Sequence, residues 1–319
     1  MLYQPALAVD RQTATVGSRR ELRTRLLAAA AVAFAGVFVV YLLAVRTRWG
    51  QDFENAALAG ARQHRGGSWY EGADRWLNRI TAESFGLSLA VIGAVGLLRR
   101  RHLLALCGVL AGLAAVLGAR ILKAVLPSRP VLGAPAGAGH ATLHVPNTLP
   151  SGHAAAAMGL FVAALIVVSS RWYVPVTLLG LPGAAISGAA TVAAHWHRLS
   201  DALAADLLAL AAGLAGLAAM AQLGLVLPTR GQTRSTVGQR LMYAVLVCVA
   251  TGALAVGAAY ALRYHDATTP SVRGEAAYWS AQALAVGAAV AVAGGTLGVC
   301  RRLESVGRLP RRTLTIPEP

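Results

Sequence analysis

Long unbroken runs of apolar residues, separated by shorter polar segments, dominate the pattern of this chain. Eight such runs lie at about 26–45, 84–98, 103–126, 153–169, 173–196, 202–226, 241–262 and 277–299. Because a helix of about 20 apolar residues crosses the ~30 Å hydrocarbon core of a bilayer, the pattern predicts eight membrane-spanning helices. The second and fourth runs are short, and Pro175 and Pro182 should bend or loosen the fifth.

The segments on either side of the first run predict how the chain enters the membrane. The first run is longer than the apolar region of a cleaved signal peptide, so we expect an uncleaved span behind a cytoplasmic segment, residues 1–24. After this span, residues 46–80 have a mixed composition. Within them, residues 75–80 fit either a short amphipathic helix at the lipid–water interface or an ordinary ordered loop.

Composition agrees with a membrane protein and excludes several other classes. Of the 319 residues, 56% are hydrophobic and only 13% are charged. This balance excludes intrinsic disorder, collagen and a disulfide scaffold. The three cysteines stand singly, without the spacing of a metal or redox site. The sequence therefore predicts an all-α polytopic membrane helix bundle.

The placement of charge predicts the orientation of the bundle. The net charge is +16, and Lys123 is the one lysine among 29 basic residues. Such a balance can indicate nucleic-acid binding, but here the arginines lie between apolar runs, at 99–101, 171, 230–240 and 301–312. By the positive-inside rule these segments and both termini face the cytoplasm, and no nucleic-acid partner is expected. Heavy use of Ala and Arg indicates a GC-rich bacterial genome, so we expect the inner membrane.

The residues that could carry chemistry gather at the predicted outer face. Lys123 lies at the end of the third run and Arg129 just after it, and two cations there could hold the oxygens of an anion. For Lys123, snorkelling at the interface is an alternative. At the start of the fourth run, Ser151 is a natural N-cap and Gly152 admits an anion to the helix N-terminus. His153 would then be placed to donate a proton, although an ordinary capped helix start has the same residues.

The third cluster begins the sixth run. His197 and Asp201 are four residues apart, so they share one face of a helix. A carboxylate on one imidazole nitrogen fixes the tautomer and makes the other nitrogen a better nucleophile. A structural His–Asp pair is the alternative, but ionisable residues at membrane depth are functional candidates. No metal site is predicted, because the histidines lack a zinc-binding spacing; they lie at His140, His144, His153, His195 and His197.

Together the three clusters resemble the signature of the type 2 phosphatidic acid phosphatase superfamily. Its pattern is Lys-x6-Arg-Pro, then Pro-Ser-Gly-His, then Ser-Arg-x5-His-x3-Asp. Residues 150–153 and the pair His197 and Asp201 match in full, and the resemblance covers about residues 84–226. Lys123 and Arg129 are separated by five residues instead of six.

A second departure concerns the family's Ser-Arg pair, because Ala190 and Thr191 stand in its place. One cation of the family's phosphate site is therefore missing from its usual position. Arg198, beside His197, or Arg120, one turn before Lys123, could supply it, and we prefer Arg198.

The resemblance implies a metal-independent lipid phosphate phosphatase without a cofactor. It implies a six-span core over 25–226, to which this chain adds a linker at 227–240, two spans within 241–300 and a cytoplasmic tail at 301–319. The expected substrate is a polyprenyl or glycerolipid phosphate or diphosphate, hydrolysed at the outer face of the bilayer through a phosphohistidine. The implied catalytic residues are His197, His153 and Asp201, and the expected phosphate ligands are Lys123, Arg129, Ser151, Gly152 and Arg198. A lipid phosphotransferase and a catalytically inactive membrane partner protein stay open as alternatives, as does the oligomeric state.

Overall fold

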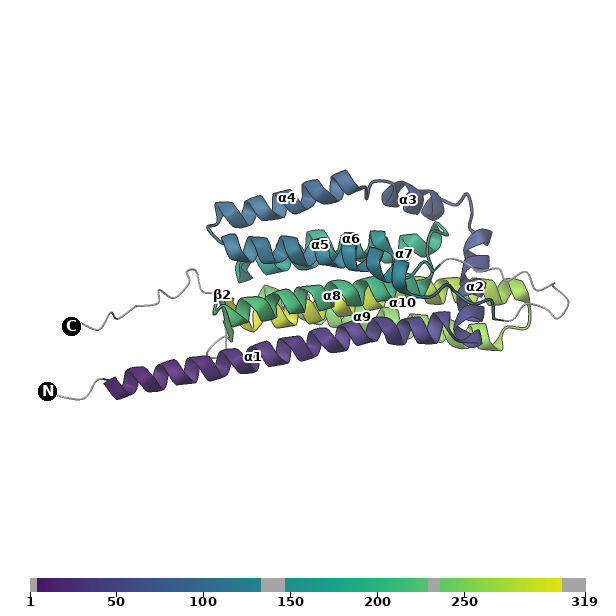
Figure 1. The fold of residues 1–319 in the computed structure, drawn as a ribbon. Helices are drawn as coiled ribbons and strands as arrows, with labels where there is room; N and C mark the ends of the chain where they lie inside the picture. The colour runs from purple at the N-terminus through teal and green to yellow at the C-terminus, as the bar shows by residue number, and fades with distance from the viewer. Residues whose placement is uncertain (1–4, 133–146, 229–235, 306–319) are drawn as a thin grey trace.

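The computed structural model describes residues 5–132, 147–228 and 236–305, which form an elongated bundle of helices (Figure 1). The helices are α1 Pro5–Val40, α2 Arg48–Gln63, α3 Ser68–Leu77, α4 Ala82–Leu98, α5 His102–Val125, α6 Gly152–Val167, α7 Tyr173–Ala193, α8 Leu199–Gln222, α9 Val237–Asp266 and α10 Pro270–Arg301. A π-helical turn, η1 Tyr41–Val45, continues α1, and a 3-10 turn, η2 Ser170–Trp172, precedes α7. Two three-residue strands, β1 Val226–Pro228 and β2 Leu303–Ser305, pair antiparallel. The all-α prediction is confirmed.

Each predicted apolar run forms a helix. Among the described residues, six helices are long and apolar enough to span a membrane: α1 with η1, α5, α7 with η2, α8, α9 and α10. The two short runs are the exceptions. α4 reaches the required length only together with α3, from which it is bent by 66°. α6 has 16 residues, and at 1.5 Å per residue it is about 24 Å long, less than a hydrocarbon core.

Successive spans alternate in direction, so the connections collect at two ends of the bundle (Figure 1). One end, here called the α2 end, holds α2, α3 and the connections from α5 to α6, α7 to α8 and α9 to α10. The other, here called the β end, holds the start of α1, the connections from α4 to α5 and α6 to α7, and the strand pair. All three predicted clusters therefore belong to the α2 end.

Small residues let the spans approach closely. Where α5 crosses α6, Gly112 and Ala115 of α5 face Gly159 and Ala163 of α6. Lipid tails are as apolar as leucine, so such close backbone contact is a main source of helix association in a membrane. α8 lies at the centre and packs against α1, α5, α6 and α10. Because α10 also packs against α2, α6 and α7, the last two spans are part of the bundle.

A close crossing joins α2 to α10. Gly60 of α2 lies against the backbone of Gly274 in α10, where a Cβ atom on Gly60 would overlap the carbonyl oxygen of Gly274 and press on Tyr278. Only a residue without a side chain fits there. This crossing fixes the position of α2, which runs across the α2 end (Figure 1).

We expect Gly60→Ala to lower the stability of the bundle. The added methyl group meets backbone atoms, which cannot rotate away, and overpacking of this kind costs about 1–3 kcal/mol. Thermal unfolding in detergent measures the effect. Gly72→Ala is the matched control, because a Cβ atom there meets nothing within 4 Å and should leave the melting temperature unchanged or slightly raised. Equal melting temperatures for Gly60→Ala and the wild type would contradict the close crossing.

Candidate active site

The structure brings the three predicted clusters together at the α2 end. Lys123 lies in the last turn of α5, Ser151 precedes α6, and His197 lies between α7 and α8. The backbone N–H of Ser151 donates a hydrogen bond to the backbone carbonyl of Asp201, at 2.9 Å, which ties the start of α6 to the first turn of α8. Lys123 lies within electrostatic range of both Asp201 and His153.

His197 and Asp201 form the predicted pair. Nδ1 of His197 lies 2.9 Å from Oδ2 of Asp201, and the backbone N–H of Arg198 donates to the same oxygen at 3.1 Å. Asp201 is fully buried, whereas His197 is half-buried. An ionised carboxylate accepts hydrogen bonds, so it holds the imidazole with a proton on Nδ1 and leaves the Nε2 lone pair available for attack.

A tight turn presents His197 to this site. The end of α7 closes with two hydrogen bonds, from the N–H of Trp196 to the carbonyl of Thr191 and from the N–H of His195 to that of Val192. This is a Schellman motif, and His195 occupies its left-handed position with φ of 62°. A residue other than glycine costs about 1 kcal/mol there. The N–H of His197 also donates to the Thr191 carbonyl, at 3.0 Å, so the turn fixes the backbone of His197.

The start of α6 forms the second side of the site. Ser151 is the N-cap, as predicted, and its Oγ accepts a hydrogen bond from the N–H of Ala154. A Cβ atom on Gly152 would meet nothing within 4 Å, so there is space beside this helix N-terminus. The ring of His153 lies edge-on to Trp196, with centroids 5.1 Å apart. Nδ1 of His153 is buried and has no hydrogen-bond partner among the described residues.

Arg129 has a partner that the sequence analysis missed. Its guanidinium donates to Oε2 of Glu54 at 2.7 Å, and both side chains are buried. Oε1 of Glu54 accepts a hydrogen bond from the N–H of Ser200 at 3.0 Å. Burial raises the pKa of Glu54, and the charge of Arg129 acts in the opposite direction. Glu54 therefore connects the segment after α5 to the start of α8.

A second residue of α2 fixes the segment after α5. Gln51 lies one helical turn before Glu54 and is also buried. Its Nε2 donates to the carbonyls of Val45 and Pro130, each at 2.7 Å, and its Oε1 accepts from the N–H of Leu132. The spacing Gln51-x-x-Glu54 places both side chains on one helix face. That spacing is the feature of the sequence that could have indicated a helix with one polar side turned toward the site.

The structure distinguishes between Arg198 and Arg120, the two candidates for the missing cation. Arg198 is half-buried, donates to Oδ1 of Asn55 at 3.3 Å, and its Nε has no partner among the described residues. Burial, and next the charge of Arg129, lower the pKa of Arg198. Arg120 is exposed, although its neighbours Ala119 and Leu122 are buried, so it points out of the bundle. Arg198 is therefore the arginine that lies beside the pair formed by His197 and Asp201.

Of the other three histidines named from the sequence, the structure describes only His195, and it has a different environment. His195 lies edge-on to Tyr70, with centroids 5.8 Å apart, and neither ring nitrogen has a hydrogen-bond partner within the described part of the chain. His140 and His144 lie outside the described residues. Across residues 5–132, 147–228 and 236–305, no three His, Cys, Asp or Glu side chains are grouped to hold a metal ion.

Comparison with known proteins supports the predicted family resemblance. Residues 102–224 match the sequence profile of the PAP2 superfamily, and this confirms the predicted resemblance over α5 to α8. The matched segment contains all three clusters, from Lys123 to Asp201. The match supports phosphatase activity on lipid phosphates and a position in a membrane. No curated protein and no solved structure matches the chain.

Glu54→Gln should make the fold depend on a bound anion. The substitution keeps the shape of the side chain but leaves Arg129 as an uncompensated buried cation, and breaking such a pair costs about 3 kcal/mol or more. We expect a lower melting temperature for the variant, and a larger upward shift on adding vanadate or phosphate than the wild type shows.

Glu275→Gln is the matched control for this prediction, because Glu275 is only half-buried and lies on α10, outside the site. It should behave like the wild type with and without the anion. An anion-induced shift of the same size in Glu54→Gln and in the wild type would show that Arg129 does not face the anion.

Proposed function

We propose that this chain is a membrane lipid phosphate phosphatase that forms a phosphohistidine on His197. The observation that carries the proposal is the hydrogen bond of 2.9 Å between Nδ1 of His197 and the buried carboxylate of Asp201. It leaves Nε2 as the free nitrogen, on a ring within electrostatic range of His153 in the first turn of α6. Each of these features favours attack on a phosphoryl group.

Two chemical steps follow from this geometry. In the first, Nε2 of His197 attacks phosphorus in line, the phosphorus–oxygen bond to the lipid breaks, and His153 protonates the departing oxygen. Asp201 stabilises the positive charge that develops on the His197 ring. In the second, His153 takes a proton from water, which attacks the phosphohistidine and releases phosphate with His197 restored.

The phosphoryl oxygens need positive charge and hydrogen-bond donors. Lys123, Arg129 and Arg198 supply three cations, so Arg198 replaces the charge absent at Thr191. Ser151 and Gly152 contribute the N-terminus of α6, where free N–H groups and the helix dipole favour an anion. The glutamate partner of Arg129 holds only part of its guanidinium, since Glu54 accepts from Nη2 alone.

An apolar groove beside the site supports a lipid substrate. It has a volume of about 550 Å³ and lies between η1, α2, α8, α9 and α10. Its walls are mostly apolar, and they include Leu43, Phe53, Leu203, Ala261, Leu262 and Leu284. Glu54 and Ser200 line the same groove, so it adjoins the ion pair that holds Arg129. We propose that the hydrocarbon chain of the substrate lies here, which gives α9 and α10 a role in binding.

The charge distribution supports an orientation for the enzyme. Arg99, Arg100 and Arg101 lie in the connection from α4 to α5, and Arg171 lies in the connection from α6 to α7. Both connections are at the β end, whereas the connection from α7 to α8, which contains His197, is at the α2 end (Figure 1). With that end in the cytoplasm, the active site faces outward across a bacterial inner membrane and both termini are cytoplasmic. A polyprenyl or glycerolipid phosphate or diphosphate in the outer leaflet would then present its headgroup to His197 while its chain stays in lipid.

His197→Ala should abolish phosphate release from a lipid phosphate. Asp201→Asn keeps the shape of the pair but favours the wrong tautomer, and we expect a loss of about 10³- to 10⁴-fold in kcat. Acid-quench trapping of a phosphorylated protein from labelled substrate tests the intermediate directly, and vanadate should inhibit as a mimic of the transition state.

Ala259→Phe serves as a folding control for these variants, because Ala259 is exposed and lies outside the groove. Its phosphate release should equal that of the wild type. Full activity in His197→Ala would contradict a histidine nucleophile, and activity lost in EDTA and restored by a divalent metal would contradict the metal-independent mechanism.

The groove predicts a dependence on chain length. Ala261→Phe should fill part of it and raise KM for a long-chain lipid phosphate by about tenfold, the equivalent of one or two displaced methylene groups. KM for a short-chain substrate and kcat for both should stay near wild type. Ala259→Phe adds the same side chain to the lipid-facing side of α9 and should change neither. A KM that rises equally for both chain lengths would contradict docking of the chain in the groove.

A further inference from the structure

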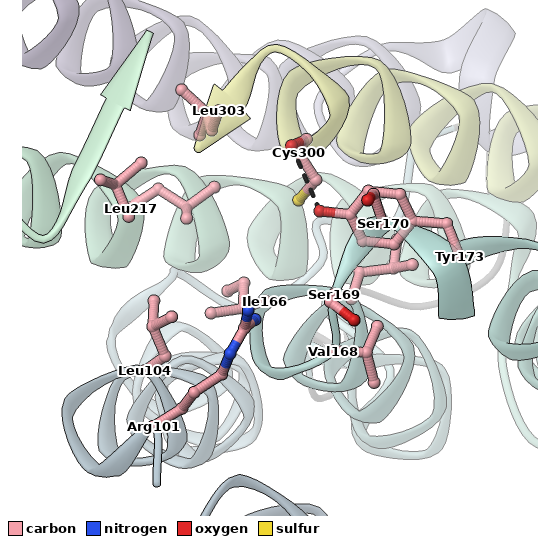
Figure 2. A pocket seen from close by; sticks show the side chains of 12 residues that line it. Arg101, Leu104, Ile166, Val168, Ser169, Ser170, Tyr173, Leu217, Cys300 and Leu303 are labelled. Atoms are coloured by element: carbon pink, nitrogen blue, oxygen red, sulfur yellow. Dashed lines mark hydrogen bonds between the residues drawn. The ribbon is translucent and has the colours of Figure 1, made fainter. Parts of the chain in front are cut away.

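A second pocket lies at the β end of the bundle, away from the candidate active site (Figure 2). It has a volume of about 280 Å³ and lies where α5, α6, α7, α8 and α10 end or begin. α5 connects the two places, since it starts beside this pocket and carries Lys123 in its last turn. With 24 residues it is about 36 Å long, so the pocket lies a membrane thickness from His197.

The pocket contains a cation without a counter-ion. Figure 2 shows the Arg101 side chain pointing into the pocket, with Ile166 and Ser169 beside it. Among the side chains that the structure describes, no carboxylate forms an ion pair with Arg101. Burial, and next the charge of Arg99, lower the pKa of Arg101. A partly buried cation of this kind gains free energy when an anion joins it.

Further positive charge and hydroxyl groups surround Arg101. Arg171 and Arg99 are close enough to repel its charge, and Arg99 donates to Oγ of Ser169 at 2.7 Å. The hydroxyls of Ser169 and Ser170 line the pocket. The Tyr173 hydroxyl donates to the carbonyl of Cys300 at 3.2 Å, which satisfies a carbonyl that would otherwise repel an anion (Figure 2).

Two helix N-termini border the same pocket. α5 begins at His102, and the 3-10 turn η2, which leads directly into α7, begins at Ser170; neither has a side-chain hydrogen bond at its N-cap. Their first N–H groups and the positive ends of their dipoles therefore add to the charge of Arg101. The volume lies just below the range of about 300–1,000 Å³ typical of ligand pockets, so a headgroup fits and an acyl chain does not.

We propose that this pocket binds a phosphate group, carried either by an anionic phospholipid of the adjacent leaflet or by free phosphate. The recognised chemistry is the same in both cases: a phosphate held by the Arg101 guanidinium, with the Ser169 and Ser170 hydroxyls beside it. Basic pockets between membrane helices at the cytoplasmic side bind anionic lipid headgroups in this way. The proposal is independent of the chemistry at His197.

Thermal unfolding of the full-length protein in detergent tests the pocket with two probes. The probes are inorganic phosphate and phosphatidylglycerol in mixed micelles, with phosphatidylcholine as the neutral lipid. Either probe that binds should raise the melting temperature of the wild type in a saturable way. In Arg101→Gln the concentration that gives half the shift should rise by about tenfold, as expected for the loss of a charge-assisted contact.

Arg100→Gln is the matched control, because it removes the same charge from an exposed neighbour. It should respond to both probes like the wild type, and Arg101→Lys should keep part of the response. A phosphate shift that Arg101→Gln weakens, without such a shift for phosphatidylglycerol, identifies a free anion as the ligand of this pocket, and the reverse result identifies a headgroup. Responses that are absent in the wild type, or unchanged in Arg101→Gln, would overturn the proposal.

Native mass spectrometry keeps the test decisive if Arg101→Gln unfolds in the thermal assay. The wild type and Arg100→Gln should bind one phosphatidylglycerol, or one phosphate, at a lower ligand concentration than Ser169→Ala and Arg101→Lys require. Equal occupancy in all four proteins would also overturn the proposal.

Discussion

The buried ion pair between Glu54 and Arg129 is the contact on which the arrangement of the α2 end depends. Burying two charges in an apolar bundle costs free energy unless each charge has a partner. Here both carboxylate oxygens of Glu54 accept a hydrogen bond. One accepts from Arg129 and the other from the N–H of Ser200. The pair thereby joins α2, the segment after α5 and the first turn of α8. It sets the place of Arg129 relative to His197, which lies three residues before Ser200.

The position of Glu54 depends in turn on the packing of small residues far from the charges. α2 can reach the core because Gly60 and Gly274 allow its backbone to touch α10. α10 therefore supports one side of the site, although its own sequence carries no chemical motif. α9 and α10 also line the apolar groove next to Glu54, so the two C-terminal spans contribute to the surroundings of the candidate site as well as to the bundle.

In the turn between α7 and α8, three consecutive residues each make a contact or adopt a conformation that shapes the candidate site. His195 takes a left-handed conformation, Trp196 packs against the ring of His153, and His197 binds Asp201. Ala190 and Thr191, behind this turn, are fully buried. Thr191 contributes its backbone carbonyl to the turn. Its side chain is uncharged, so this position supplies no cation. Arg198 adjoins His197 in the sequence and donates a hydrogen bond to Asn55 of α2.

The sequence by itself determined the class of fold and most of the candidate site. Apolar runs of membrane length can satisfy their backbone groups only as helices, so the eight runs located the helices. The N-cap at Ser151 and the pairing of His197 with Asp201 are local, because each depends on residues three or four apart. The tertiary structure decided what joins distant segments: the partner of Arg129 is 75 residues away, and that of Arg198 is 143 residues away. Periodicity and spacing in the sequence indicate which residues are neighbours on one helix. They do not indicate which helices pack together, and the surroundings of α2, of the groove and of Arg101 depend on that packing.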